Sequence, residues 1–109
     1  MSLYAEFIQE REGFSILEDD DSFVTYRLQG DECYARDIYI SPRIRGDKLS
    51  FLLGRQVYEK AKDAGCKHFI SSVWVDDPGK YRSVAMLTRF GMKMLKEENG
   101  LLYFIKEIE

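Results

Sequence analysis

Several features are scarce or missing in this sequence, and each absence excludes a class of protein. No apolar run approaches the roughly 20 residues needed to cross a bilayer, so we expect no membrane span and no membrane partner. The first eleven residues carry Glu6 and Glu10 and lack the apolar core of a signal peptide, which indicates a cytoplasmic protein. The net charge is -3, and without a basic face we expect no nucleic-acid partner.

Residues that commonly bind metals are also scarce. The two cysteines, Cys33 and Cys66, are far apart in the chain and lack metal-ligand spacing, and His68 is the single histidine. We therefore expect no metal site, and two reduced thiols that are buried. The length of 109 residues fits a single domain spanning residues 1–109, and the hydrophobic content of 45% is enough to form a core.

Apolar spacing and turn residues predict the elements of the first half of the chain. A short amphipathic helix is predicted at the start and ends at Gly13. Its apolar face is predicted to be Leu3, Tyr4, Phe7 and Ile8. Strand-forming residues then fill 14–17, 23–28 and 33–41. The two-residue turn Gly30-Asp31 joins the second and third of these strands, so we expect an antiparallel meander.

The second half begins with the longest helix. A helical period over residues 47–64 predicts this helix, with Gly65 in the left-handed conformation after its end. The face predicted to pack on the sheet consists of Leu49, Leu52, Leu53, Val57 and Ala61. We then expect a strand at 67–75, a short helix at 81–90 and a C-terminal hairpin whose turn is Asn99-Gly100.

The predicted order of elements defines the fold class. The order is α-β-β-β-α-β-α-β-β, and the strand, helix and strand in its middle imply a parallel, right-handed crossover. The remaining strands are expected to pair antiparallel. We therefore predict an α/β (α+β) domain with a mixed, mostly antiparallel sheet that contains one parallel β-α-β unit.

The segment between the third strand and the long helix carries the most specific pattern in the chain. It reads Ile38-Tyr39-Ile40-Ser41-Pro42-Arg43-Ile44-Arg45-Gly46-Asp47-Lys48-Leu49-Ser50. An apolar strand thus runs through a proline and an Arg-Gly pair into a helix. A helix N-terminus presents up to four unpaired N–H groups and the positive end of the helix dipole. Such a helix start is an anion site, and small residues allow phosphate oxygens to approach the backbone.

This segment resembles the central motif of the GNAT superfamily of acetyl-CoA-dependent N-acetyltransferases. In that family the loop supplies backbone N–H groups that bind the pyrophosphate of acetyl-CoA. The resemblance implies a GNAT-like fold, acetyl-CoA as co-substrate and an amine of a small molecule or peptide as acceptor. The residues that it implies for acetyl-CoA binding are Ile38, Tyr39, Ile40, Arg45, Gly46, Asp47, Lys48, Leu49 and Ser50.

The sequence departs from the family pattern at several positions. Lys48 stands where the loop has its first glycine, and Ser50 stands where it has its final glycine or alanine. Residues 83–92 resemble a second helix of the family, but Leu87 replaces a tyrosine that often protonates the departing thiolate. The family's first strand and the helical pair after it are reduced to one short helix.

Acetyl transfer requires a base for the amine, a polarised carbonyl and a proton for the thiolate. We predict Asp37, on the third strand, as the general base, with Glu32 behind it. Tyr81 is predicted as the catalytic proton donor, with Tyr39 as the alternative. In the family a backbone N–H of the central strand polarises the carbonyl, and Ile40 is the candidate for that position.

Two functional classes remain open. The first is an N-acetyltransferase, which the Arg45-Gly46 helix start favours. The second is a non-catalytic GNAT-like module, viral or accessory, that keeps the fold for binding or assembly, and Leu87 and Lys48 favour it. Without the family's first strand, an uncovered sheet edge is expected to favour a symmetric homodimer. The C-terminal hairpin is apolar on both faces, with Leu102 and Phe104 on one and Leu101 and Tyr103 on the other. The core covers one face, and in a monomer the N-terminal helix would cover the second.

Overall fold

The computed structural model describes residues 2–44 and 47–109. In chain order its elements are α1 (Leu3–Glu12), β1 (Ser15–Glu18), β2 (Ser22–Gln29), β3 (Glu32–Ile40), α2 (Asp47–Asp63), β4 (His68–Trp74), α3 (Lys80–Arg89), β5 (Lys93–Glu98) and β6 (Leu101–Glu107). This order is the one predicted from the sequence. No helix in the described ranges combines the length and the apolar content that a bilayer span requires.

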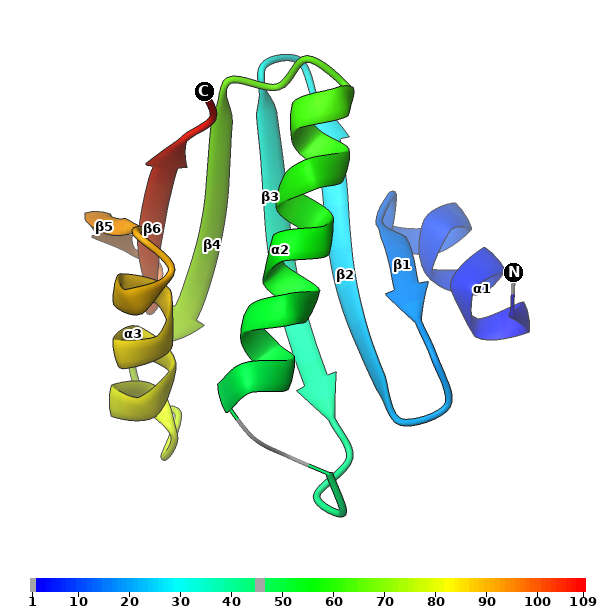
Figure 1. Ribbon diagram of the computed structural model, residues 1–109, viewed down its shortest axis with the longest axis horizontal. Helices are drawn as coiled ribbons and strands as arrows, with labels where there is room; N and C mark the ends of the chain where they lie inside the picture. Colours follow the sequence, from blue (N-terminus) through cyan, green and yellow to red (C-terminus); the bar gives the residue numbers. More distant parts are fainter. Residues whose placement is uncertain (1, 45–46) are drawn as a thin grey trace.

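The described strands form one six-stranded sheet in the order β1-β2-β3-β4-β6-β5. Strands β3 and β4 are parallel, and every other neighbouring pair is antiparallel. Figure 1 shows α2 lying across the face of the sheet over β3, where it connects β3 to β4. The predicted mixed, mostly antiparallel sheet with one parallel β-α-β unit is therefore confirmed.

Two predicted turns join the hairpins as expected. Gln29 pairs with Glu32, so the turn has two residues, and Gly30 adopts a φ of +60°. At the C-terminal hairpin, Asn99 and Gly100 have φ values of 54° and 80°. A type I′ turn requires positive φ at both central residues, which is why Asn-Gly predicts it.

The core lies between α2 and the sheet. Leu53, Val57 and Ala61 are buried along one stripe of α2, as predicted, and Leu49 is half-buried. The same prediction was wrong for Leu52, whose side chain is 47% exposed because it lies about 100° around the helix from Leu53. Both cysteines are free and buried, as expected. The buried cluster comprises Val24, Cys33, Ala35, Val57, Ala61, Cys66, Phe69, Val73, Leu87, Met92 and Phe104.

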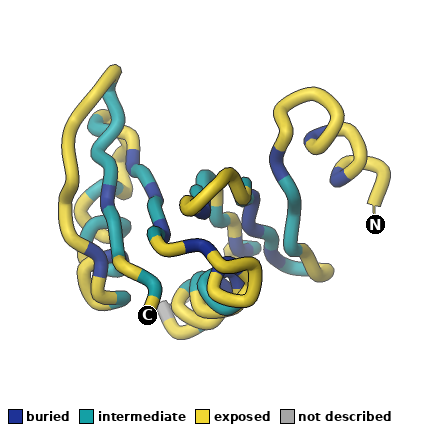
Figure 2. Tube along the Cα trace, turned by 90° about the horizontal axis from the view of Figure 1, so that it is seen from above, coloured by how far each residue is buried: buried dark blue, intermediate teal, exposed yellow. Residues whose placement is uncertain are grey.

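The predicted apolar face of α1 is confirmed only for Ile8. Ala5 and Ile8 are buried, whereas Leu3, Tyr4 and Phe7 are 82%, 54% and 49% exposed. The helix contacts β1, at the opposite edge of the sheet from the β5–β6 hairpin (Figure 2). It therefore cannot cover the second face of that hairpin, and this alternative was wrong.

Candidate functional site

The parallel strands β3 and β4 pair at one end only. The ladder joins Glu32 with His68 and finishes where Ala35 meets Ser71. Both strands continue beyond that point, β3 to Ile40 and β4 to Trp74, and they separate as they do so (Figure 1). A cleft of about 720 Å³ lies in the region where the strands have separated.

Residues from both faces of the sheet line the cleft. Neighbouring residues of a strand point to opposite faces, yet consecutive residues 36–40 of β3 and 71–74 of β4 all line the cleft. A cavity with such walls must pass between the two strands. On the face covered by α2 and α3, its walls include Ser50, Ser83 and Met86.

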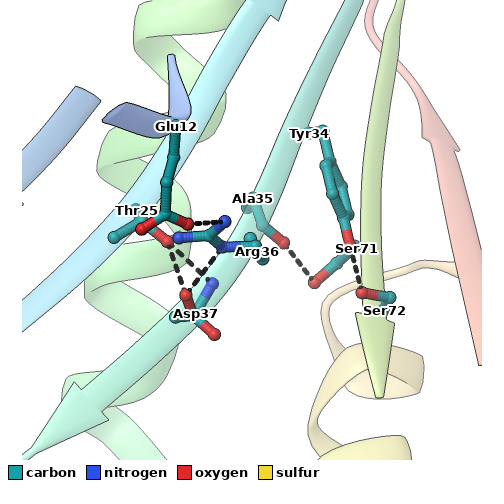
Figure 3. A network of polar contacts seen from close by, with 8 residues as sticks. All are labelled: Glu12, Thr25, Tyr34, Ala35, Arg36, Asp37, Ser71 and Ser72. Atoms are coloured by element: carbon teal, nitrogen blue, oxygen red, sulfur yellow. Dashed lines mark hydrogen bonds and ion pairs between the residues drawn. The ribbon is translucent and has the colours of Figure 1, made fainter. Parts of the chain in front are cut away.

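Hydroxyl groups join the two strands where the cleft begins. The Ser71 Oγ donates a hydrogen bond to the Ala35 carbonyl oxygen at 2.9 Å. The Tyr34 hydroxyl and the Ser72 Oγ are 2.5 Å apart and share a hydrogen bond (Figure 3). Burial raises the pKa of the Tyr34 phenol, while the bond with Ser72 acts in the opposite direction. Tyr34 and Ser72 both line the cleft, so its closed end is polar.

A β-bulge in β3 decides which face carries Asp37. Tyr26 of β2 is opposite Ala35, and the next β2 residue back, Thr25, is opposite Asp37, so Arg36 has no partner in the ladder. In a regular strand Asp37 would point to the same face as Ala35, which is buried in the core. The extra residue turns Asp37 to the other face, where its side chain is 52% exposed in the cleft.

Only one of the two Asp37 carboxylate oxygens is engaged by the described residues. Thr25 Oγ1 and Arg36 Nε donate to Oδ2 at 3.1 and 2.9 Å, and the Asp37 backbone N–H donates to Thr25 Oγ1 at 3.1 Å. Figure 3 shows the second oxygen, Oδ1, pointing away from both donors. Asp37 can therefore accept a proton or bind an ammonium group through Oδ1.

The residues predicted to bind acetyl-CoA fall into three groups. Ile38, Tyr39, Ile40 and Ser50 line the cleft. Lys48 is exposed and Leu49 half-buried, and neither lines it. Arg45 and Gly46 lie outside the described residues, and Asp47 is described only as the start of α2.

The structure does not bring Tyr81 into the cleft. Its side chain is 80% exposed and its ring lies beside the ammonium group of Lys80, 5.0 Å from the ring centre. Glu32 lies at the opposite, paired end of β3 and is also outside the cleft lining. Leu87 is buried and lines the cleft, so the α3 position at which the family often has tyrosine carries no hydroxyl here.

Sequence reasoning missed several residues of the cleft. Tyr34, Ser72, Trp74 and Arg82 line it, and no motif or spacing marks them. A signal for the bulge was present in the sequence of β3. Cys33 and Ala35 occupy odd positions, whereas Ile38 and Ile40 occupy even positions. This change of alternation indicates an extra residue between them. Among the residues that the structure describes, no group of three His, Cys, Asp or Glu side chains is arranged to hold a metal ion.

The mixed sheet and the cleft between its two diverging parallel strands agree with the family that the sequence itself identifies. The sequence model of the Acetyltransferase (GNAT) family matches residues 3–92, and the chain belongs to this family. No curated protein sequence shows significant similarity to the chain.

Solved structures of acetyltransferases share the fold at low sequence identity. Nourseothricin acetyltransferase is 18% identical with a TM-score of 0.71, covers 88% of this chain and is itself covered over 65% of its length. A Bacillus subtilis acetyltransferase in complex with CoA is 10% identical, with a TM-score of 0.75 and coverage of 95% of this chain and 84% of its own. The Escherichia coli ribosomal-protein-S18-alanine N-acetyltransferase is 12% identical, with a TM-score of 0.73 and coverage of 99% and 77%. The chain thus spans less than two thirds of the first of these proteins.

Proposed function

We propose that the protein transfers an acetyl group from acetyl-CoA to the amine of a small molecule or peptide. The observation that carries this proposal is the cleft between β3 and β4, which is lined from both faces of the sheet and includes Asp37. Two reactants can then approach one point from opposite sides. Family membership and the CoA complex of the Bacillus subtilis relative support an acyl-CoA ligand.

The face of the cleft next to α2 suits the co-substrate. Ser50 lies in the first turn of α2 and lines the cleft, so the start of this 17-residue helix adjoins the same space. The unpaired N–H groups and the dipole of a helix start attract phosphate groups. Ile38 and Ile40 would contact the apolar arm along β3, and acetyl-CoA would supply the acetyl thioester. Arg45 and Gly46 belong to this site as a prediction from the sequence.

The other face of the cleft suits the acceptor amine. Asp37 Oδ1 would take a proton from the amine nitrogen as general base. The nitrogen would then attack the thioester carbonyl carbon, so that a C–N bond forms while the C–S bond breaks. The departing thiolate needs a proton at the end of this sequence.

Tyr34 is the tyrosine that we assign to that proton transfer. Its hydroxyl hydrogen-bonds with Ser72 at the closed end of the cleft, whereas Tyr81 lies outside it. The ordinary pKa of a tyrosine, 10.0, already keeps this hydroxyl protonated at neutral pH, and burial raises the pKa of Tyr34 further. Tyr39 also lines the cleft, with its ring stacked on Phe23 at a centroid distance of 5.7 Å.

The second candidate function is a GNAT-like module that binds an acyl-CoA without turnover. Leu87 favours it, because a buried leucine stands where the family often has its catalytic tyrosine. Under this alternative the cleft keeps its ligand, and the acceptor face serves binding or assembly.

Calorimetry and a turnover assay separate the two candidates. Acetyl-CoA and CoA would be titrated into the full chain, and thiol release would be followed with tyramine, cadaverine, lysine and a peptide with N-terminal alanine. We expect binding, turnover of at least one amine, and a loss of about 100-fold or more in kcat for Asp37→Asn. Ser50→Tyr should weaken CoA binding, because the larger side chain would fill the start of α2.

Each outcome of these two experiments supports a different conclusion about the function. Turnover that Asp37→Asn removes supports the acetyltransferase. Binding of CoA without turnover of any amine supports the non-catalytic module. No heat and no thermal shift with millimolar CoA would contradict both candidates.

Self-association is a further part of the proposal. Strand β1 has four residues and forms one edge of the sheet, and the exposed side chains of Leu3, Tyr4 and Phe7 lie on the adjacent helix α1. A second copy of the chain would cover these apolar side chains in a symmetric dimer. Sedimentation equilibrium at micromolar concentration tests this, with Tyr4→Ser/Phe7→Ser expected to shift the mass toward the monomer. A monomer mass for the unmodified chain would rule the dimer out.

A further inference from the structure

We infer that Arg36 is a positioning residue, which holds the Asp37 carboxylate so that Oδ1 faces the acceptor side of the cleft. This inference rests on the proposed function, because it assigns a role to a neighbour of the proposed base. It also connects the end of α1 to the cleft, through a bridge from Glu12 to Arg36 to Asp37 (Figure 3).

The bulge makes the contact between Arg36 and Asp37 available. In a regular strand two consecutive side chains point to opposite faces and cannot bind each other. In a bulge, two residues lie opposite a single residue of the partner strand, here Thr25. Arg36 and Asp37 therefore share one face, and the Arg36 Nε donates to Asp37 Oδ2 at 2.9 Å.

The two donors to Asp37 approach from different sides and bind the same oxygen. Arg36 comes from the bulge, and Thr25 comes from β2, where it is only 2% exposed and so has little freedom to move. The rotation of the carboxylate about its last torsion is fixed when Oδ2 is held by two donors. Oδ1 is left without a hydrogen bond from the described residues, on a side chain that lines the cleft.

The guanidinium of Arg36 is itself held on three sides. Its Nη1 donates to Glu12 Oε1 at 2.7 Å, at the last residue of α1. Its guanidinium carbon lies over the ring of Phe14, 4.0 Å from the ring centre. Its side chain is only 28% exposed. Arg36 is therefore held by contacts with Glu12, Asp37 and Phe14, and such support is what a positioning residue requires.

Arginine is the side chain that can make this bridge. A guanidinium presents several N–H donors in a rigid plane, so one residue can bind two carboxylates at once while stacking on an aromatic ring. A lysine has a compact ammonium group without that plane. Arg36→Lys would keep the positive charge but lose the simultaneous contacts with Glu12 and Asp37.

Arg27 provides a matched control within the same chain. Its guanidinium carbon lies 4.8 Å from the centre of the same Phe14 ring, but no hydrogen bond or ion pair links it to Asp37. Arg27→Lys thus makes the same chemical change on the same aromatic ring. Any effect that is special to Arg36 cannot come from stacking on Phe14 alone.

The test compares kinetics of the full chain for the two lysine variants, with the best acceptor of the four amines. For Arg36→Lys we expect kcat to fall about 10-fold while KM for acetyl-CoA stays within about twofold, because the opposite face of the cleft is unchanged. For Arg27→Lys we expect both constants to stay within about twofold. Equal kinetics for the two variants, or a rise of KM alone in Arg36→Lys, would overturn the inference.

A second measurement does not depend on turnover. The side-chain Nε–H of Arg36 can be observed by ¹⁵N NMR in the free protein, and it should shift in both Glu12→Gln and Asp37→Asn. An Arg36 Nε–H chemical shift that is unchanged in Asp37→Asn would show that the bridge is absent and would overturn the inference. If the resonance responds but no amine is acetylated, the bridge stands and the acetyltransferase proposal is the one that fails.

Discussion

The two ends of the β3–β4 pair are built from different kinds of side chain. Where the strands are joined, Cys33, Ala35, Phe69 and Ser71 are all buried. Where the strands have separated, Asp37, Tyr39 and Trp74 are exposed along the cleft. Ile40 and Val73 are buried at the open end as well, so the core continues there on the face next to α2, while the candidate chemistry lies among the exposed side chains. Substitutions of the buried side chains at the joined end should therefore change stability, and those of the exposed side chains at the open end should change activity.

The largest effect expected from this comparison is at Phe69. It is 3% exposed and packs edge-on against Tyr58 at a centroid distance of 5.7 Å. Phe69→Ala should lower the free energy of unfolding by about 3–5 kcal/mol, as is usual for a buried phenylalanine. Trp74, on the same strand at the open end, is 58% exposed, so Trp74→Ala should cost about 1 kcal/mol or less. Urea unfolding of both variants measures the difference, and equal losses would break the comparison.

A smaller effect is expected at Tyr34, which lies at the boundary between the two ends. Tyr34→Phe removes the hydroxyl that bonds with Ser72 but keeps the ring next to Tyr103, at a centroid distance of 6.3 Å. We expect kcat to fall about 10-fold or more, within the usual range for a general acid. Stability should change by about 1 kcal/mol, the usual contribution of one hydrogen bond. An unchanged kcat would remove Tyr34 from the mechanism, and Tyr39→Phe is the matched variant to try beside it.

The smallest expected effect is on the pH dependence of stability, and it arises at Cys33, at the joined end. Burial, and then the nearby Cys66, raise the pKa of its thiol from the ordinary 9.0 to about 12. Above pH 9 the unfolded chain loses this proton while the folded chain keeps it, so the folded state binds more protons. Its contribution to stability is therefore present below pH 9 and is lost as the pH rises from about 9 toward 12.

Urea unfolding between pH 7 and pH 10.5 tests this pH dependence. Cys33→Ala should lower stability at neutral pH through lost packing, but its stability should decline less steeply above pH 9 than that of the unmodified chain. Parallel declines for the two proteins would contradict the assignment to Cys33. In the folded protein this thiol should also resist alkylation at pH 8, since the thiolate is the reactive form.

Much of the fold was predictable because it depends on local patterns. The helical period of α2 and the Asn99-Gly100 turn each act over a few residues, and both were confirmed. Leu52 and three of the four residues predicted for the apolar face of α1 were predicted wrongly, because periodicity does not say which neighbouring stripe meets the sheet. Tyr4 and Phe7, for example, are apolar residues at helical spacing that lie outside the core.

The candidate site was less predictable because it is made by distant segments. Asp37 was predicted from its residue type and its strand, and it lines the cleft. Tyr34 and Ser72 are 38 residues apart in the chain and meet only because β3 and β4 are parallel neighbours. Nothing near either residue in the sequence marks that meeting. Tyr81 was chosen from residue type alone, and the helix turns it away from the cleft.

The bulge at Arg36 has a consequence for comparing this chain with longer or shorter variants. Deleting one residue between Ala35 and Asp37 would restore regular alternation in β3, so every later side chain of the strand would change face. Asp37 would turn into the core, and Ile38 would turn outward to the acceptor side. The number of residues between the Gly30-Asp31 turn and the start of α2 is therefore as much a part of the site as their identities. If a sequence alignment misplaces a single gap in this segment, it matches buried positions of one strand with exposed, reactive positions of the other.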